Sequence, residues 1–209
     1  MHLLFLPGTD GSGALWTPLL DALGDLARDA EVVRYPTNVG RYDALLDGIA
    51  KLETPTVVIA ESFGGPLAIR LAARDANVRA LVLIASFARG PRLARWMRAL
   101  VALAPHPPPR ALLRMAMLGG ADPIDGALVD AIAAVDASAM RERIREVASV
   151  DVREVLATLS IPITWIHASR DRLLGAPAAG SIVIDGPHLL AQTRPREIAD
   201  AITNALRAT

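Results

Sequence analysis

Two patterns of apolar positions alternate along most of the chain. Short runs rich in valine, leucine and isoleucine are typical of strands that are buried on both faces. They predict strands at residues 2–6, 31–35, 56–60, 78–85, 161–167 and 181–184. Longer stretches, in which apolar residues recur with helical spacing, predict helices at residues 14–26, 42–52, 66–74, 151–159 and 195–207. Strands that alternate with helices in this way indicate an α/β fold with a mainly parallel sheet.

Residues 88–150 interrupt this alternation. The pattern predicts no strand there and four helices instead, at residues 93–103, 110–118, 127–135 and 139–147. Prolines and glycines, which end helices, separate these segments. Further along, only residues 168–180 join the last two predicted strands, which is near the minimum for a parallel connection and leaves room for a turn or two of helix.

Composition narrows the class of protein. The chain has 209 residues, enough for one domain with a substantial core, and 52% of them are hydrophobic. Its formal net charge is zero, so charge does not favour binding to nucleic acid or to an anionic membrane. The lack of cysteine excludes disulfides and cysteine nucleophiles, and it fits a cytoplasmic protein. We expect no membrane span and no signal peptide, because no apolar run is long enough and the first residues carry no basic group.

The sequence Ala60-Glu61-Ser62-Phe63-Gly64-Gly65 lies between a predicted strand and a predicted helix. A strand, a sharp turn that carries a serine, and a helix form the setting of the nucleophile elbow G-x-S-x-G. Such a turn is strained and needs small neighbours, and Ala60 and Gly64 flank Ser62 at two residues on either side. The alternative is that Ser62 only caps the helix, since serine is a favoured N-cap.

This elbow and its setting resemble the α/β-hydrolase superfamily, with Ala60 in place of the first glycine. The resemblance covers almost the whole chain. It implies a doubly wound six-stranded sheet of order 2-1-3-4-5-6 with helices on both faces. It also implies that residues 88–150 form a helical cap, inserted into a hydrolase core made of residues 1–87 and 151–209. The alternative for residues 88–150 is a run of ordinary surface helices beside the sheet.

A serine nucleophile needs a base, usually a histidine that a carboxylate orients, and the superfamily order is nucleophile, acid, histidine. The resemblance implies His188 as the base, because it lies between the last strand and the last helix; His167 is the rival. It implies Asp171 as the acid, in the loop after the fifth strand, with Asp185 as the alternative. Asp171 could instead form only an exposed salt bridge with a neighbouring arginine.

The loop after the first predicted strand contains Pro7-Gly8-Thr9, and Trp16 follows the glycine by eight residues. Many members of the superfamily have His-Gly-X here, with a tryptophan at that spacing and the backbone N–H of X in the oxyanion hole. The resemblance therefore implies the N–H of Thr9, or of the neighbouring Asp10, as one oxyanion donor and the N–H of Phe63 as the other.

We expect neither a cofactor nor a metal. The glycines of residues 8–13 are spaced G-x-x-G-x-G, which differs from the dinucleotide fingerprint G-x-G-x-x-G, and Asp10 would repel a pyrophosphate. The sequence has no H-E-x-x-H motif and no clustered histidines.

Apolar residues are more frequent in residues 88–150 than a surface helix requires. We expect some of them to line a pocket above Ser62, namely Trp96, Met97, Met115 and Leu118. Methionine and leucine form an adaptable wall that suits acyl chains. The pattern resembles small bacterial carboxylesterases and predicts cleavage of a carboxylic ester or thioester, free or attached to a carrier, through an acyl-serine. The alternatives are a non-catalytic ligand-binding protein on the same fold and an acyltransferase that uses the same triad.

Overall fold

The predicted strands form one parallel sheet in the computed structural model, which describes residues 1–91, 117–118, 125–177 and 179–207. The strands are β1 His2–Leu6, β2 Glu31–Val32, β3 Thr56–Glu61, β4 Val78–Ile84, β5 Ile163–Ala168 and β6 Ile182–Ile184. Their order is β2-β1-β3-β4-β5-β6, and every neighbouring pair is parallel. The predicted sheet and strand order are therefore confirmed. The order reverses between β1 and β3, where α/β folds place their sites.

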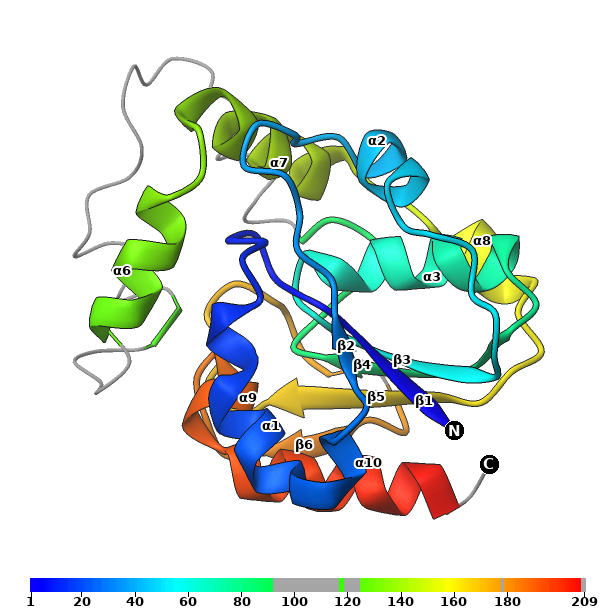
Figure 1. Ribbon diagram of the computed structural model, residues 1–209. Helices are drawn as coiled ribbons and strands as arrows, with labels where there is room; N and C mark the ends of the chain where they lie inside the picture. The colour runs from blue at the N-terminus through cyan, green and yellow to red at the C-terminus, as the bar shows by residue number, and fades with distance from the viewer. Residues whose placement is uncertain (92–116, 119–124, 178, 208–209) are drawn as a thin grey trace.

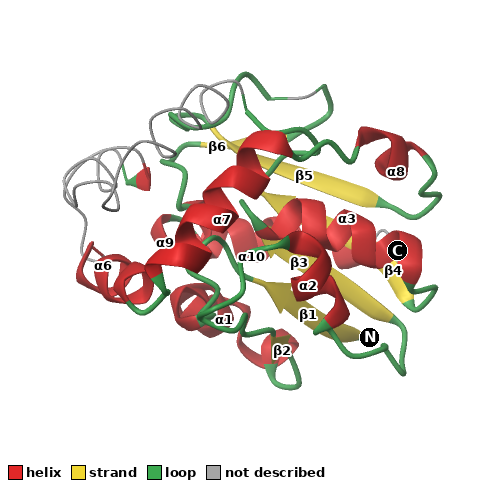
Figure 2. Ribbon diagram, turned by 90° about the horizontal axis from the view of Figure 1, so that it is seen from above, coloured by secondary structure: helices red, strands yellow, loops and turns green. Residues whose placement is uncertain are grey.

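Helices cover both faces of the sheet, as the predicted fold class requires (Figure 1). One face carries α1 Thr17–Leu23, with the 3-10 helices η1 Ala14–Trp16 and η2 Gly24–Ala27 at its ends, and also α9 Leu190–Thr193 and α10 Pro195–Arg207. The other face carries α2 Tyr42–Asp47, α3 Gly64–Arg74 and α8 Arg153–Ala157, which lie in front of the strands in Figure 2. None of the described helices is long and apolar enough to cross a membrane.

Burial on both faces explains why the strand sequences are apolar throughout. Side chains alternate along a strand, so Leu3 and Phe5 of β1 pack in the cluster under α1 and α10. Leu4 and Leu6 pack in the opposite cluster, which α3 covers. All four side chains are at most 3% exposed. The absence of a polar alternation is thus the mark of a sheet between two helical layers.

The second strand is shorter than the predicted range 31–35. The N–H of Val33 still donates to the Phe5 carbonyl (3.0 Å), but the N–H of Tyr35 donates to the Gly11 carbonyl (2.8 Å) in the loop after β1. As an edge strand, β2 pairs only with β1. After β2 the chain leaves β1, and Tyr35 contacts the loop beside the predicted nucleophile.

Two helices also differ from the prediction. The range 14–26 is divided into η1, α1 and η2, and Gly24 at the end of α1 has a φ of +54°, which is incompatible with a continuing helix. The range 42–52 is helical only as far as Asp47, because beyond it the N–H of Leu52 donates to the Asp75 carboxylate (2.9 Å).

The short connection between β5 and β6 has no helix among its described residues, which form turns and bends. Strand β6 is accordingly the least covered part of the sheet. Its Ile182 and Val183 are 40% and 53% exposed.

The two ends of the segment 88–150 lie side by side. Arg89 and Asp151 form an antiparallel bridge, and the N–H of Gly90 donates to the Val150 carbonyl (2.9 Å). The segment thus leaves the sheet layer and returns to it at one place, as an insertion must.

Two helices of this segment are described, α6 Asp125–Ala133 and α7 Ala137–Ser149, close to the predicted ranges 127–135 and 139–147. Figure 1 shows α6 beside the carboxyl ends of the strands, and α6 packs against η1. Helix α7 is joined to the loop before α2, because the N–H of Asp136 donates to the Thr37 carbonyl (3.1 Å). The predicted helix 93–103 and most of 110–118 lie outside the described residues.

Candidate active site

Ser62 lies at the sharp turn between β3 and α3. Its φ is +50°, in the left-handed region that residues other than glycine rarely adopt, so the turn is strained. The start of α3 lies against the end of β1, and a Cβ on Gly64 would come within 2.6 Å of the Leu6 carbonyl oxygen. A Cβ on Gly65 would collide with Ser86. Only small residues therefore fit around this serine.

A chain of hydrogen bonds links the three residues that the sequence analysis placed in the triad. The Ser62 Oγ lies 2.8 Å from His188 Nε2, and His188 Nδ1 lies 2.7 Å from Asp171 Oδ2. All three residues are shielded from solvent, with the His188 and Asp171 side chains 1% and 0% exposed. Donation from Nδ1 to the carboxylate leaves Nε2 able to accept the serine proton, which is the tautomer that general-base chemistry requires.

Asp171 is held as an anion by several donors. Its second oxygen, Oδ1, accepts hydrogen bonds from the backbone N–H groups of Leu173 (2.8 Å) and Leu174 (2.9 Å). Burial on its own would raise the pKa of Asp171, but the hydrogen bond and charge of His188 and the two backbone N–H groups outweigh burial and lower it. The carboxylate is therefore both charged and fixed in orientation.

The rival residues lie elsewhere. Asp185 is exposed, accepts a hydrogen bond from the Ser169 hydroxyl (2.8 Å) and forms a salt bridge with Arg170 (3.0 Å between Nε and Oδ1). The arginine pairing considered for Asp171 is thus made by Asp185. His167 lies within β5 rather than in a loop after a strand.

The Phe63 N–H is oriented by the carbonyl of the residue before it. The Ser62 carbonyl accepts hydrogen bonds from the Gly65 N–H (3.1 Å) and the Ser86 hydroxyl (2.7 Å). In a planar trans peptide the N–H points opposite to the C=O, so the Phe63 N–H points away from these two donors. Among the described residues, no group accepts a hydrogen bond from it.

The Thr9 N–H is oriented in the same way. The Gly8 carbonyl accepts a hydrogen bond from the Gly11 N–H (3.1 Å), so the Thr9 N–H points in the opposite direction. It too has no acceptor within the described part of the chain. The loop is close to the serine, since a Cβ built on Gly8 would lie 4.0 Å from the Ser62 Cβ. Two backbone N–H groups without an acceptor in the described part of the chain thus belong to residues close to the candidate nucleophile.

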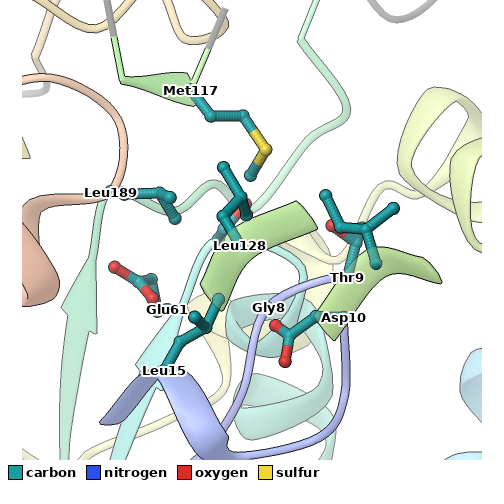
Figure 3. Close-up of a pocket in the computed structure, with 10 residues that line it drawn as sticks. Gly8, Thr9, Asp10, Leu15, Glu61, Met117, Leu128 and Leu189 are labelled. Atoms are coloured by element: carbon teal, nitrogen blue, oxygen red, sulfur yellow. The ribbon is translucent and has the colours of Figure 1, made fainter. Parts of the chain in front are cut away.

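A pocket opens beside Ser62 (Figure 3). The described residues that line it are Gly8, Thr9, Asp10, Leu15, Glu61, Ser62, Met117, Leu128, Ile132 and Leu189. Figure 3 shows Met117 on the side of the pocket opposite Asp10. Of the predicted wall, Trp96, Met97 and Met115 lie outside the described residues. Leu118 is buried in the apolar cluster that contains Leu15, Leu128 and Leu189, but Met117 reaches the pocket in its place.

Glu61 is a pocket residue that the motif did not single out. It is 3% exposed; its Oε2 accepts a hydrogen bond from Gln192 Nε2 (2.7 Å), and its Oε1 has no hydrogen-bond partner among the described residues. Burial raises its pKa to about 7, although the Gln192 hydrogen bond and the charge of His188 oppose this. A carboxylate at the end of an otherwise apolar strand was the available signal in the sequence. No local signal pointed to Ser86 or Gln192.

No group of three histidine, aspartate or glutamate side chains suited to a metal ion occurs in the described part of the chain. The described site combines a serine, a histidine, an aspartate and two backbone N–H groups without acceptors, which is a combination that can support acyl transfer to a serine.

Comparisons with known proteins agree with this fold. A model of the alpha/beta hydrolase family matches residues 3–201. No curated protein matches the chain at a significant level. Similar solved structures include a lipase-esterase related protein from Clostridium acetobutylicum, with 20% identity, a TM-score of 0.77 and coverage of 97% of this chain and 93% of that one.

Two further structures are similar over nearly the whole chain. The enol-lactonase from Burkholderia xenovorans has 18% identity and a TM-score of 0.74, with 99% of this chain and 91% of that one covered. A hydrolase from Pseudomonas aeruginosa has 21% identity and a TM-score of 0.71, with 98% and 89% covered. At such identities the likeness shows the fold, and the chemistry must be argued from the site.

Proposed function

Because this chain belongs to the alpha/beta hydrolase family, we propose that it is a serine hydrolase that cleaves a carboxylic ester or thioester through an acyl-Ser62 intermediate. The observation that carries the proposal is the buried hydrogen-bond chain from Ser62 through His188 to Asp171. Two of the similar structures are described as a lipase-esterase related protein and an enol-lactonase. A lactone is a cyclic ester, so both descriptions agree with ester cleavage.

In the proposed reaction, Ser62 Oγ attacks the carbonyl carbon while His188 Nε2 takes the serine proton. Asp171 keeps the imidazole in the required tautomer and stabilises the imidazolium. The N–H groups of Thr9 and Phe63 donate to the oxyanion that forms. His188 then gives its proton to the leaving alcohol or thiol. A water molecule, deprotonated by His188, releases the acid and regenerates Ser62.

We propose that residues 88–150 act as a cap that forms the acyl-binding wall. The side-by-side ends of the segment, at Arg89 and Asp151, support an inserted unit. Met117 lines the pocket from within it, together with Leu128 and Ile132 of α6. We extend the wall to the predicted residues that lie outside the described part of the chain, Trp96, Met97 and Met115. Such a wall favours short to medium acyl groups on a small substrate, free or attached to a carrier.

The proposed setting of the reaction is the cytoplasm. The chain has no cysteine and therefore no disulfides, which are rare in reducing compartments, and its net charge of zero does not favour nucleic acid as a partner. Fractionation of the native cell and detection with an antibody would test the location.

The test of the nucleophile is a fluorophosphonate probe, which forms a covalent bond only with an activated serine. Intact-mass analysis should show one adduct per molecule in the wild type and none in Ser62→Ala. Ser160→Ala removes an exposed hydroxyl and serves as the matched control, with labelling equal to the wild type. A labelled Ser62→Ala protein would assign the nucleophile to another residue. A folded wild type that is never labelled would overturn the proposal and favour a ligand-binding protein.

A further inference from the structure

Arg143 of α7 is fully buried and points into the loop beside Ser62. Its exposure is 0%, and no carboxylate among the described residues lies within salt-bridge distance. Every acceptor that the described residues offer the guanidinium is a backbone carbonyl. Nη1 donates to Thr9 (2.8 Å) and Asp10 (3.2 Å), Nη2 to Pro36 (2.8 Å) and Val39 (2.9 Å), and Nε to Val39 (3.1 Å).

Burying a charge in this way is costly unless its donors are satisfied, and the arginine fork allows several carbonyls to be bound at once. The surrounding sequence is adapted to it. Gly11 has a φ of +67°, and a Cβ there would come within 2.7 Å of Arg143 Nη1. The Tyr35 ring lies 5.7 Å from the guanidinium carbon. Burial lowers the pKa of Arg143, while Tyr35 and Asp10 raise it, and the group stays charged at neutral pH.

These bonds determine how the loop residues are turned. Because Nη1 holds the Thr9 carbonyl, the Asp10 N–H in the same peptide unit points away from the guanidinium. Because Nη1 also holds the Asp10 carbonyl, the Gly11 N–H points back to the Gly8 carbonyl, which it contacts at 3.1 Å. That contact in turn orients the Thr9 N–H. One side chain therefore controls three successive peptide units.

We propose that Arg143 is a positioning residue that holds the oxyanion loop in its donating conformation from the cap. The inference rests on the proposed function, because it assigns the Thr9 N–H to the oxyanion. It adds that α7 takes part in shaping the active site through its contacts with the loop after β1. It also gives a reason for Gly11 in the loop after β1, because a Cβ there would meet the guanidinium.

The test compares Arg143→Met, which removes all five hydrogen bonds, with Arg143→Lys, which keeps the charge and part of the bonding. Arg145→Met is the control, since Arg145 is an exposed arginine on the same helix. Hydrolysis of p-nitrophenyl butyrate is measured per active site, with the sites counted by complete fluorophosphonate labelling. Removal of one oxyanion donor in serine hydrolases lowers kcat by about 100- to 1,000-fold.

For Arg143→Met we expect kcat per active site to fall about 10- to 100-fold, with KM changed less than about threefold. Affinity for a trifluoromethyl ketone, whose adduct mimics the tetrahedral intermediate, should fall by the same factor as kcat/KM. Arg143→Lys should lie between this variant and the wild type. If Arg143→Met does not fold, Gly11→Ala should reproduce the loss in kcat by displacing the guanidinium.

If Arg143 has only a structural role, Arg143→Met should reduce the number of labelled sites and leave kcat per site and ketone affinity unchanged. That result would overturn this inference and leave the proposed function intact. A wild type and an Arg145→Met variant that neither hydrolyse the ester nor react with the probe would instead overturn the proposed function.

Discussion

The elbow and the loop after β1 each contain a backbone N–H group that we propose as an oxyanion donor, of Phe63 and of Thr9, but different parts of the chain hold the two groups in place. At the elbow, the Ser62 carbonyl is bound by Gly65, three residues away, and by Ser86 at the end of the adjacent strand. At the loop, the Thr9 carbonyl is bound by Arg143, which is 134 residues away in the sequence. One donor depends on the sheet, and the other depends on the inserted segment.

The two regions also differ in how they bury charge. Arg143 has five hydrogen bonds to carbonyls, whereas Glu61 at the elbow has one bound oxygen and one without a partner. A buried group with unsatisfied oxygen lowers stability when it ionises. The elbow is thus strained and is held by residues of the sheet layer. The loop after β1 is held by a residue of the segment 88–150.

The largest effect is expected outside both regions, at Asp171, the proposed acid. Asp171→Asn should keep the fold and lower kcat for ester hydrolysis by about 10,000-fold, because an amide does not hold the histidine in the required tautomer. Asp185→Asn, at the exposed rival, is the matched control and should stay within about twofold of the wild type. Steady-state kinetics on p-nitrophenyl butyrate distinguish the two. A damaging Asp185→Asn together with a harmless Asp171→Asn would reverse the assignment.

The next effect concerns the buried carboxylate of Glu61 at the elbow and is measured as the dependence of stability on pH. The pKa of Glu61 is about 7 in the folded protein and 4.5 for a free glutamate, so the folded state retains the proton to higher pH. Stability is therefore lost as the pH rises through this window, by on the order of 3 kcal/mol. Glu61→Gln removes the titration and should become more stable relative to the wild type as the pH rises.

Urea unfolding at about pH 5 and about pH 8 measures this difference in stability. Glu53→Gln, at an exposed site outside the elbow, should show no such change. Parallel pH profiles for the wild type and Glu61→Gln would mean that Glu61 does not bear the buried charge.

A smaller effect is expected from a change that holds the Phe63 N–H, the donor at the elbow, less firmly. Ser86→Ala removes one of the two hydrogen bonds to the Ser62 carbonyl, and Gly65 retains the other. We expect kcat per active site to fall about tenfold at most, less than for Arg143→Met, which loses every bond at once. The variants are compared by active-site titration with Ser160→Ala as the control. A loss in Ser86→Ala that exceeds the loss in Arg143→Met would invert the proposed difference between the two regions.

The smallest effect concerns the wall of the pocket. Met117→Ala and Leu128→Ala should shift the preference among p-nitrophenyl esters towards longer acyl chains, with a selectivity change of about 0.8 kcal/mol, or about fourfold, per methylene. The ratio of kcat/KM between chain lengths is the measure, because it does not depend on the amount of folded enzyme. Leu26→Ala, at a residue that is 49% exposed, is the control. An unchanged profile in both variants would show that the acyl group binds elsewhere.

The sequence by itself determined the sheet, its strand order and the places from which the triad residues come. Apolar runs such as 56–60 and 78–85 are local signals of strands buried on both faces, and the turn at Ser62 is defined by its immediate neighbours. Asp171 and His188 follow predicted strands, and the carboxyl ends of parallel strands share one edge of the sheet. The strands and the turn use information within a few residues of the position concerned, whereas the strand order and the choice of Asp171 and His188 also needed the resemblance to a known superfamily.

Only the tertiary structure decided which of these side chains come into contact and which other residues hold them in place. Asp171 and Asp185 are both close to His188 in the sequence, yet packing brings one into contact and leaves the other at Arg170. The link from Arg143 to Thr9 has no periodicity or spacing that a sequence pattern could carry. Such contacts depend on how separate segments pack, and the free energy of packing belongs to side chains that are distant in the sequence and adjacent in space.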